Sequence, residues 1–567
     1  MSLDVPMTDG LELRVLSSLS KVFADAELAD RPIEQGSALA GEVYSFQIAY
    51  RSPTALRGVR VGLESALAPY TTLRKVGLAP SELPAFEKRD VHYLRTTPGL
   101  YPDVLEPLDG ELAILPAQWR SLWVQIAIPA DASALPHGPD AASTYPLTLS
   151  FIDESGETLG AAAFTLEVVP VSLPAQRLIH TCWFHCDCIA TQYGVEVFSE
   201  EHWRLIGIYA RNAAEHSVNM LLTPLFTPPL DTAVGGERPT VQLIGVEEAG
   251  AGQYRFDFSR LVRWIEMCRE AGIEYLEFSH LFTQWGAGHA PKIVAGSGPS
   301  ERRLFGWDTD AASDAYRSFL DQFLPQLAAF IKAHQLQDRV YFHVSDEPHL
   351  DHLESYRTAS EMLKQHLSEF RFFEALSNYE FYESGLVPIP VPASDHIGPF
   401  LEHNVEPRWT YYCCGQGVDV ANRFFSMPSA RNRILGMQLF QFEVSGFLHW
   451  GYNFWYTQHS LRQIDPFRVT DAGGAFPSGD SFVVYPGQEG PLDSLRWEVF
   501  REGIQDLRAL ELLASLTGRE RALEIMLEDW EGELRFDDYP RDLEWLIGAR
   551  ERINQAIKQA AHGLVMR

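Results

Sequence analysis

The sequence predicts an N-terminal β-sandwich, then a (β/α)8 barrel of the TIM type, then a C-terminal helical region packed on the barrel. Residues 1–175 contain short runs of β-branched and aromatic residues separated by turn formers. Residues 176–491 alternate apolar strand candidates with helical patterns, as an α/β barrel requires. Residues 492–567 show mostly amphipathic helical spacing. We therefore expect three domains with these boundaries.

The first domain is expected to be all-β because helical periodicity is scarce in it. Turns such as 153–156 interrupt its strands at intervals typical of a β-sandwich. Ser172-Leu-Pro174 marks the expected boundary with the barrel. The clearest strand candidates are residues 43–50, 122–128, 145–152 and 162–169.

The second domain is expected to hold eight parallel strands with helices between most of them. A doubly wound open sheet is the alternative, but no glycine-rich phosphate loop opens any of the helices. The strands are expected at 181–185, 220–226, 275–280, 340–344, 372–376, near 396–397, at 409–413 and at 447–450. Helices are expected at 201–215, 258–271, 315–333 and 429–442, and in the third domain at 494–516, 520–529 and 543–561.

Three stretches rich in proline or glycine are expected to be loops. The Pro-rich stretch is 387–392, and the Gly-rich stretches are 286–300 and 473–490. Loops as long as the last two often form lids or binding loops in compact enzymes.

Composition excludes several classes of function. The formal charge of −30 and the pI of about 5.0 argue against nucleic acids and anionic membranes, because phosphate binding needs clustered basic residues. No apolar run approaches the ~20 residues of a membrane span, and the first ten residues lack the features of a signal peptide. Six cysteines in 567 residues do not suggest a disulfide scaffold. We expect a cytoplasmic protein with reduced thiols, and no feature of the sequence predicts its oligomeric state.

Two adjacent carboxylates, Asp346 and Glu347, follow the apolar run 340–344 directly. Acids at the C-terminal end of a buried parallel strand lie where α/β barrels place their chemistry, and glycosidic bond cleavage often uses two neighbouring carboxylates. The alternative is that Asp346 caps the helix after Pro348 and Glu347 is a solvated loop acid. The segment alone leaves both interpretations open.

Other predicted strands end in aromatic rings and polar side chains. A barrel brings such strand ends to one face, around Asp346 and Glu347. Rings that stack on the C–H faces of a sugar, beside groups that pair with its hydroxyls, suit a carbohydrate. The strand ends carry Trp183, His185 and Asp187; His280 and Trp285; Asn378; Tyr411; and Trp450, Asn453 and Trp455.

Two other chemistries are disfavoured. The cluster His180, Cys182, His185, Cys186 and Cys188 resembles a metal site, but along a strand His185 would face away from the others, and the chain has no Cys-x-x-Cys pair. A serine hydrolase would need a Gly-x-Ser-x-Gly turn after a strand, which the sequence lacks. The adjacent cysteines at 413 and 414 are expected to be packing residues.

The assembled motifs resemble glycoside hydrolase family 123, whose characterised members are β-N-acetylgalactosaminidases. The resemblance covers the barrel and the helical end. It rests on Ser345-Asp-Glu-Pro348, on Gly446-Phe-Leu-His-Trp450 with Trp455, and on three later motifs. These are Gly479-Asp480 with Tyr485-Pro-Gly487, Ser494-Leu-Arg496, and Arg501-Glu-Gly503.

The resemblance implies a retaining, substrate-assisted hydrolysis. Glu347 matches the general acid/base, and Asp346 matches the carboxylate that orients the 2-acetamido group of the sugar. The acetamido oxygen attacks the anomeric carbon to give an oxazolinium intermediate, so neither an enzyme nucleophile nor a metal or organic cofactor is required. Repulsion between adjacent acids separates their pKa values, which lets one donate a proton while the other is charged.

We expect an exo-acting glycosidase that releases β-linked N-acetylgalactosamine from a small or oligosaccharide substrate. Either Trp450 or Trp455 is expected to form part of the wall around the acetamido methyl group. Alternatives are a β-N-acetylglucosaminidase, a non-catalytic carbohydrate-binding protein, and a two-carboxylate glycosidase with Asp187 or Asp395 as nucleophile. The expected substrate contacts are His185, Asp187, His280, Trp285, Asn378, Tyr411, Trp450, Asn453, Trp455 and Tyr485.

Overall fold

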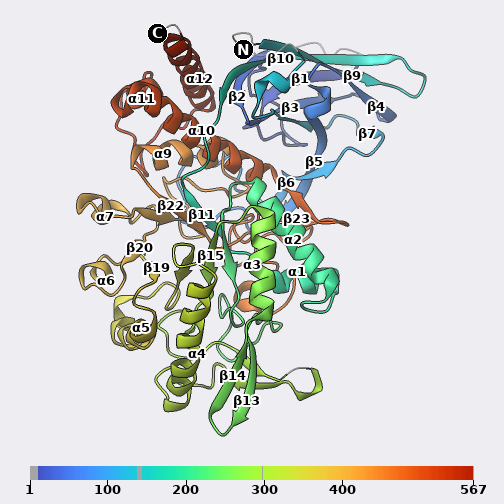
Figure 1. Ribbon diagram of the computed structural model, residues 1–567. Coiled ribbons are helices and arrows are strands. Elements are labelled where there is room, and N and C mark those ends of the chain that lie inside the picture. Colours follow the sequence, from blue (N-terminus) through green and yellow to red (C-terminus); the bar gives the residue numbers. More distant parts are fainter. Residues whose placement is uncertain (1–9, 137–142, 297, 566–567) are drawn as a thin grey trace.

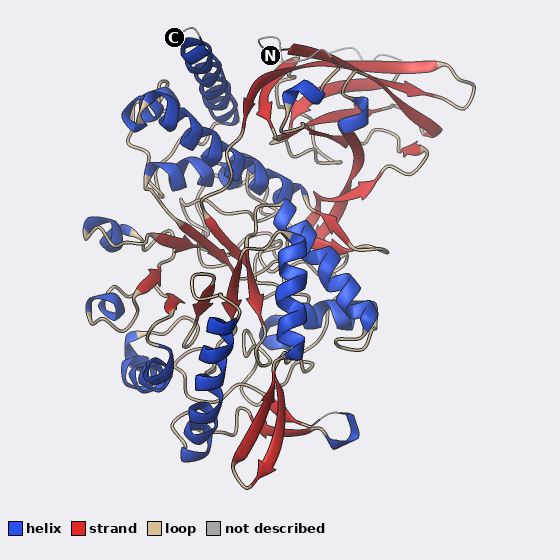
Figure 2. Cartoon of the chain, viewed as in Figure 1, coloured by secondary structure: helices blue, strands red, loops and turns tan. Residues whose placement is uncertain are grey.

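A computed structural model describes residues 10–136, 143–296 and 298–565 (Figure 1). The chain forms an N-terminal all-β region, a barrel of parallel strands surrounded by helices, and a C-terminal group of helices (Figure 2). The predicted fold class is confirmed. No helix in the described ranges is long and apolar enough to cross a membrane.

Two sheets of the described part form the sandwich. Their inner faces meet in an apolar core in which Phe46 stacks on Phe164 with ring centroids 4.4 Å apart. The first sheet has the order β1 (Glu12–Ser17), β3 (Val43–Arg51), β8 (Arg120–Ala127), β5 (Thr71–Ser81), β6 (Gly99–Pro107). The second has the order β2 (Gln35–Ala40), β10 (Thr158–Ser172), β9 (Ser143–Ile152), β4 (Leu56–Glu64), β7 (Leu112–Ile114).

The barrel strands follow one another around the sheet in chain order, and every pair is parallel. Tyr411 closes the seam between the sixth and seventh strands, because its N–H donates to Pro392 O at 3.0 Å and its carbonyl accepts from Ser394 N at 2.8 Å. The described strands are β11 (Ile179–Cys182), β12 (Met220–Thr223), β15 (Tyr275–Phe278), β18 (Val340–Phe342), β19 (Arg371–Ala375), β20 (Ile389–Val391), β21 (Trp409–Tyr411) and β22 (Gly446–His449).

The sixth strand differs from the prediction. It is β20, which lies inside the Pro-rich stretch 387–392 that was expected to be a loop, whereas residues 396–397 precede the short helix α7 (Gly398–Glu402). Pro390 pairs with Glu374 of β19 and has no N–H to donate on either side. The missing donor is tolerated because β20 meets β21 only through an isolated bridge at the barrel seam.

The helices around the barrel begin and end close to their predicted positions. In α4, Tyr316, Phe319 and Phe323 are buried at spacings of three and four residues, and the side chain of Ser313 caps the first turn by accepting from Tyr316 N. The described helices of the barrel are α1 (Cys186–Tyr193), α2 (Glu200–Glu215), α3 (Ser259–Ala271), α4 (Asp314–Ala333), α5 (Leu353–Leu367), α6 (Glu380–Glu383), α7, α8 (Ser429–Arg433) and α9 (Leu435–Gln441).

The C-terminal helices contact the sandwich as well as the barrel. Helix α10 (Leu495–Thr517) packs on α8 and α9, and α11 (Arg519–Met526) follows it. Helix α12 (Leu543–Val565) packs on α10 and on strands β2 and β10 of the sandwich. The region therefore packs on the barrel and also contacts the sandwich.

Asp103 of β6 ties the sandwich to the barrel. Its carboxylate accepts from Arg496 Nε at 2.8 Å, from Arg496 Nη2 at 3.0 Å and from the Tyr485 hydroxyl at 2.6 Å. All three residues are buried. Lys21 adds a second link by donating to Phe425 O at 2.7 Å, and burial lowers the pKa of its amine to about 7. The two parts therefore share a polar, desolvated boundary.

Candidate active site

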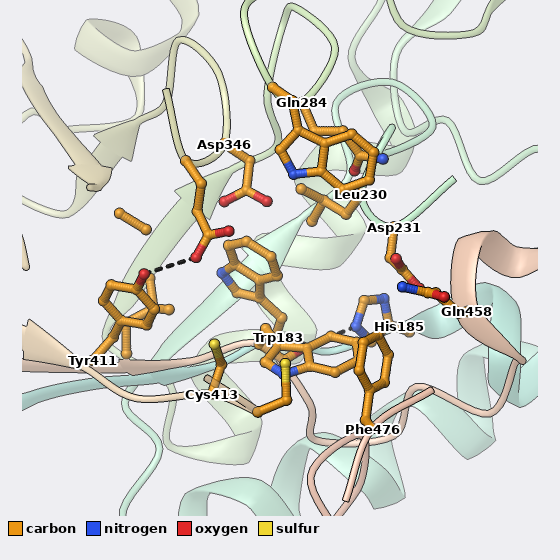
Figure 3. A pocket seen from close by; sticks show the side chains of 16 residues that line it. Trp183, His185, Leu230, Asp231, Gln284, Asp346, Tyr411, Cys413, Gln458 and Phe476 are labelled. Carbon is orange, nitrogen blue, oxygen red and sulfur yellow. Dashed lines mark hydrogen bonds between the residues drawn. The ribbon is translucent and has the colours of Figure 1, made fainter. Parts of the chain in front are cut away.

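A pocket lies at the C-terminal end of the barrel strands (Figure 3). Its empty space is about 740 Å³ including the open mouth, which is within the usual range for a small-molecule site. Asp346 and Glu347 line it together, so the strand-end argument placed them correctly. The lining residues are Trp183, His185, Leu230, Asp231, Gln284, Trp285, Asp346, Glu347, Ala375, Tyr411, Cys413, Cys414, Leu448, Trp450, Gln458 and Phe476.

The backbone turns sharply where it carries the two acids. Glu347 has a φ of +43°, in the left-handed region that non-glycine residues rarely adopt. The carbonyl of Asp346 accepts a 3.1 Å hydrogen bond from the N–H of Trp285, which also has positive φ. Helix α5 begins only at Leu353, so neither acid caps it. The helix-cap interpretation of these residues is therefore wrong.

The two acids lie in different electrostatic surroundings. Burial raises the pKa of Asp346 well above its usual range, and the neighbouring charges of Glu347 and Glu374 raise it further. Glu347 accepts a 2.7 Å hydrogen bond from the Tyr411 hydroxyl, which stabilises its carboxylate. Burial and the neighbouring acids therefore favour the neutral form of Asp346.

Buried acids hold two indole rings of the pocket in place. Trp183 donates from Nε1 to Glu277 at 2.6 Å, and Trp450 donates from Nε1 to Asp480 at 2.9 Å. Burial raises the pKa of Asp480 to about 7. Trp285 lies at the mouth with 41% of its surface exposed. Fixed rings of this kind form apolar walls on which one face of a sugar can stack.

The wall opposite Tyr411 is polar and was not predicted. Asp231 and Gln458 lie there, with His185 beside them (Figure 3). Asp231 accepts from His459 N at 3.0 Å, and burial raises the pKa of its carboxyl. Its φ of +38° places another strained residue in the pocket.

Six of the predicted site residues come together in the pocket. They are Asp346, Glu347, His185, Trp285, Tyr411 and Trp450. The His185 ring is nevertheless 98% buried, because its Nε2 lies 3.1 Å from Trp450 O and its Nδ1 lies 3.1 Å from Arg238 Nη2. It therefore presents only an edge to the pocket.

Two further predicted contacts, Asp187 and Asn453, do not line the pocket but help to hold His185 in place. Asp187 forms a buried bidentate ion pair with Arg238, at 2.6 and 2.9 Å, and Arg238 in turn contacts His185. Asn453 accepts from His185 N at 2.8 Å and donates to His185 O at 3.1 Å. Neither side chain lines the pocket, and both help to hold His185 in place.

Four more predicted contacts lie outside the pocket lining. Trp455 is fully buried and donates to Val484 O, so of the two rings expected around an acetamido methyl only Trp450 lines the pocket. Tyr485 is buried against Asp103 of the sandwich. His280 is buried beneath the pocket, and Asn378 precedes α6 as a half-exposed residue. An aromatic or polar residue near a strand end is thus often a core residue.

Several lining residues were missed. Asp231 follows the proline-rich run 224–230, where no periodic signal indicates which side chains turn inward. Gln458 and Phe476 come from the long segment after β22, and only the glycine-rich composition of 473–490 indicated a binding loop there. Cys413 and Cys414 were expected to be packing residues, but both line the pocket.

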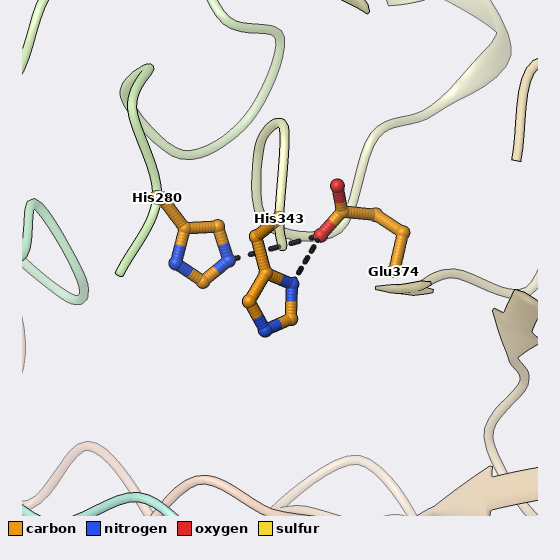
Figure 4. Close-up of side chains that lie close together, drawn as sticks. All are labelled: His280, His343 and Glu374. Atoms are coloured by element: carbon orange, nitrogen blue, oxygen red, sulfur yellow. Dashed lines mark hydrogen bonds and ion pairs between the residues drawn. The ribbon is translucent and has the colours of Figure 1, made fainter. Parts of the chain in front are cut away.

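His280, His343 and Glu374 form one of two side-chain groups in the described part of the chain that resemble a metal site (Figure 4). Their potential ligand atoms lie within 4.8 Å of one another. The two imidazole rings are stacked 4.0 Å apart and nearly parallel, which points their lone pairs into separate planes. Both nitrogens of His343 already contact carboxylates, Glu374 at 2.8 Å and Glu277 at 2.7 Å. The geometry suits a hydrogen-bond network better than the coordination of one ion.

The family profile for the catalytic domain of glycoside hydrolase 123 matches residues 183–513, which is more than half of the 567-residue chain. The chain belongs to glycoside hydrolase family 123. The resemblance inferred from the motifs is confirmed, and this family 123 chain is therefore a glycosidase. No curated protein matches it.

Among solved structures, it is similar to a family 123 glycoside hydrolase from Clostridium perfringens described for glycolipid glycan hydrolysis. The TM-score is 0.73 at 15% identity, and the match covers 98% of this chain and 99% of that one. It also matches a mutant of Bacteroides uniformis β-glucuronidase 2, with a TM-score of 0.28 at 9% identity, covering 84% of this chain and 48% of that one. A family 10 xylanase from termite gut with a bacterial Ig-like domain gives 0.31 at 9% identity, covering 84% and 100%. The last two scores are too low to indicate a shared fold.

Proposed function

We propose that this family 123 glycosidase releases terminal β-linked N-acetylgalactosamine by substrate-assisted hydrolysis with retention of configuration. The observation that carries the proposal is the adjacency of Asp346 and Glu347 in one aromatic-walled pocket at the C-terminal end of the barrel. Adjacent carboxylates on one turn approach the sugar from the same side. This suits a mechanism in which the nucleophile comes from the substrate itself.

The proposed first step forms one bond and breaks another. The acetamido oxygen attacks the anomeric carbon while the bond from that carbon to the glycosidic oxygen breaks, and Glu347 gives its proton to the departing oxygen. In the second step water attacks the anomeric carbon, returns a proton to Glu347 and opens the oxazolinium ring. Asp346 stabilises the positive charge of the intermediate, and the ring of Trp450 packs against the acetamido group.

Substrate binding must move a proton within the pair. Burial favours the neutral form of Asp346, whereas the proposed roles need the proton on Glu347. The acetamido N–H is a hydrogen-bond donor, so it favours the ionised form of Asp346 when it binds there. The proton then passes to the adjacent Glu347, beside the glycosidic oxygen.

A two-carboxylate mechanism remains the second candidate, because one other acid lines the same pocket. Among the described lining residues this is Asp231, on the opposite wall. The nucleophiles expected from sequence are poorly suited, since Asp187 is held by Arg238 and Asp395 is bonded to His396 and Gln416. A two-carboxylate enzyme would also cleave glycosides that lack the acetamido group.

Nitrophenyl glycosides separate these possibilities. The wild type is expected to cleave the β-N-acetylgalactosaminide and not the β-galactoside, and Asp346→Ala and Glu347→Ala are each expected to lose most of this activity. Preference for the β-N-acetylglucosaminide would reassign the sugar but keep the mechanism. Cleavage of the β-galactoside, with loss of activity in Asp231→Asn, would favour the two-carboxylate mechanism. Binding of sugar without hydrolysis would identify a carbohydrate-binding protein.

The physiological substrate class is also proposed. The Clostridium perfringens relative is described as hydrolysing glycolipid glycans. A glycolipid glycan that ends in β-linked N-acetylgalactosamine is therefore the first natural substrate to test. Its oligosaccharide, freed from the lipid, is the matched control that shows whether the lipid contributes to recognition.

A further inference from the structure

Glu374 binds the backbone that carries the catalytic pair. Its Oε2 accepts hydrogen bonds from Val344 N at 2.9 Å and from Ser345 N at 3.0 Å, the two peptide groups immediately before Asp346. The hydroxyl of Tyr356 donates to the same oxygen at 3.1 Å. Hydrogen bonds to a buried carboxylate are strong and directional. Glu374, from the neighbouring strand β19, therefore fixes the point at which the chain leaves β18 for the pocket.

His343 connects Glu374 to a second buried acid, Glu277. The side chains of the three residues, here called the buried triad, are at most 1% exposed. A single imidazole donates from both nitrogens only when it is protonated. Burial disfavours that cation, but the charges of Glu374 and Glu277 outweigh burial and raise the pKa of His343 to about 9. The raised pKa favours an imidazolium at neutral pH, held between two acidic side chains.

The other end of the triad reaches the aromatic wall of the pocket. Glu277 accepts from Trp183 Nε1 at 2.6 Å and from the Thr181 hydroxyl. Trp183 lines the pocket. His280 stacks on His343, and burial together with the charge of His343 lowers its pKa far below the usual range, so it adds no charge. One connected group thus contacts both the catalytic segment and a ring of the pocket.

We propose that the buried triad is a positioning device: its hydrogen bonds fix Asp346 relative to Trp183, and its charged groups act on Asp346. The proposal rests on the proposed function only in requiring that Asp346 takes part in hydrolysis. The other titratable groups that face Asp346 are Glu347 beside it, Asp231 on the loop after β12, and Tyr411 on β21. None of these contacts the backbone before Asp346 as Glu374 does.

The charge of each member predicts the direction of a kinetic shift. Glu374→Gln removes a negative charge near Asp346, whereas His343→Gln removes a positive one. The alkaline limb of the pH profile of kcat/KM reports loss of the proton shared by the pair in the free enzyme. We expect that limb to move to lower pH in Glu374→Gln and to higher pH in His343→Gln, by roughly half a unit or more. Movement in the same direction, or no movement, would overturn the electrostatic part of the proposal.

The positional part has its own readout. Glu374→Gln keeps an acceptor oxygen but weakens the hydrogen bonds to two peptide N–H groups. We therefore expect kcat to fall about tenfold or more, with KM changed by less than about threefold. Glu277→Gln leaves those two peptide groups bound, so its kcat is expected to fall less. A larger loss in Glu277→Gln than in Glu374→Gln would contradict the assignment.

A control variant separates this role from general destabilisation. Asp90→Asn breaks an ion pair with Arg431 at 2.8 Å whose side chains are at most 6% exposed and do not line the pocket. It is expected to lower the unfolding temperature without moving either limb of the pH profile. If it shifts the profile as Glu374→Gln does, the shift reflects stability and the proposal fails.

A measurement without substrate distinguishes failure here from failure of the proposed function. In histidine-labelled protein at pH 7.5, nitrogen NMR is expected to show one imidazolium signal that disappears in His343→Gln. A neutral His343 would overturn the triad whatever the enzyme hydrolyses. An imidazolium in a protein that cleaves no glycoside would instead leave the triad in place and refute the proposed function.

Discussion

The hydroxyl of Tyr411 donates a 2.7 Å hydrogen bond to Glu347 Oε1, across the seam that closes the barrel. Tyr411 thus closes the sheet through its backbone and contacts a catalytic acid through its side chain. Burial and the charge of Glu347 raise the pKa of Tyr411, so it remains a donor throughout the working range.

Removing that hydroxyl is expected to slow the enzyme. A hydrogen bond to a charged partner contributes about 1.5–3 kcal/mol, so Tyr411→Phe should lower kcat/KM by roughly 10- to 100-fold. The matched control is Tyr412→Phe, since the hydroxyl of buried Tyr412 has no hydrogen-bond partner among the described residues. Steady-state kinetics of both variants on the nitrophenyl substrate test this, and equal losses would show that the Tyr411 hydroxyl has no special role.

Leaving groups are expected to separate the roles of the two acids. A good leaving group such as dinitrophenolate departs without a proton, so Glu347→Ala should retain far more activity on it than on a methylumbelliferyl glycoside. Asp346→Ala should lose activity on both, because stabilisation of the intermediate does not depend on the leaving group. The reverse pattern would mean that Asp346, and not Glu347, is the proton donor.

The charge of His343 predicts how stability depends on pH. Its pKa is raised from 6.5 to about 9 in the folded protein, so its stabilisation is fully present below pH 6.5 and is lost as the pH rises through about 9. A difference of 2.5 units corresponds to about 3 kcal/mol. Between pH 6 and pH 9.5, the free energy of unfolding in urea should fall by this amount more in the wild type than in His343→Gln. Equal losses in both proteins would mean that His343 is not charged when folded.

Thiol reagents are expected to block the pocket. Cys413 and Cys414 line it, whereas Cys182, Cys186, Cys188 and Cys268 are at most 2% exposed. Methyl methanethiosulfonate should therefore inactivate the enzyme, and N-acetylgalactosamine should slow the loss. The double variant Cys413→Ser/Cys414→Ser should keep its own activity through the same treatment. If the double variant is inactivated as fast as the wild type, the reagent acts on another cysteine and the prediction is wrong.

Much of the fold could be predicted because each element has a local signal. Helix α4 has apolar residues every three or four positions, and Ser313 caps it. Strand β18 is a short apolar run that ends in acids. Strand β20 was missed because Pro390 argues against a strand, and only the weak pairing at the barrel seam allows one there.

The site was predicted as far as strand ends determine it. Asp346, Glu347, Tyr411 and Trp450 lie within a few residues of a strand, and the parallel sheet brings them together. Beyond the strand ends the direction of a side chain depends on tertiary packing. Trp455 lies five residues after Trp450 but turns into the core, and Asp231 comes from an aperiodic loop.

Asp103 also determines whether the barrel can be produced without the sandwich. A fragment starting near residue 176 would lack this acid, leaving the guanidinium of Arg496 without its carboxylate and the phenol of Tyr485 without an acceptor. Losing this ion pair and the contacts around it is expected to cost several kcal/mol, a large fraction of what keeps any domain folded. Attempts to produce the barrel without the sandwich should therefore yield insoluble material. The sandwich is thus a structural requirement of the enzyme and not a separable module.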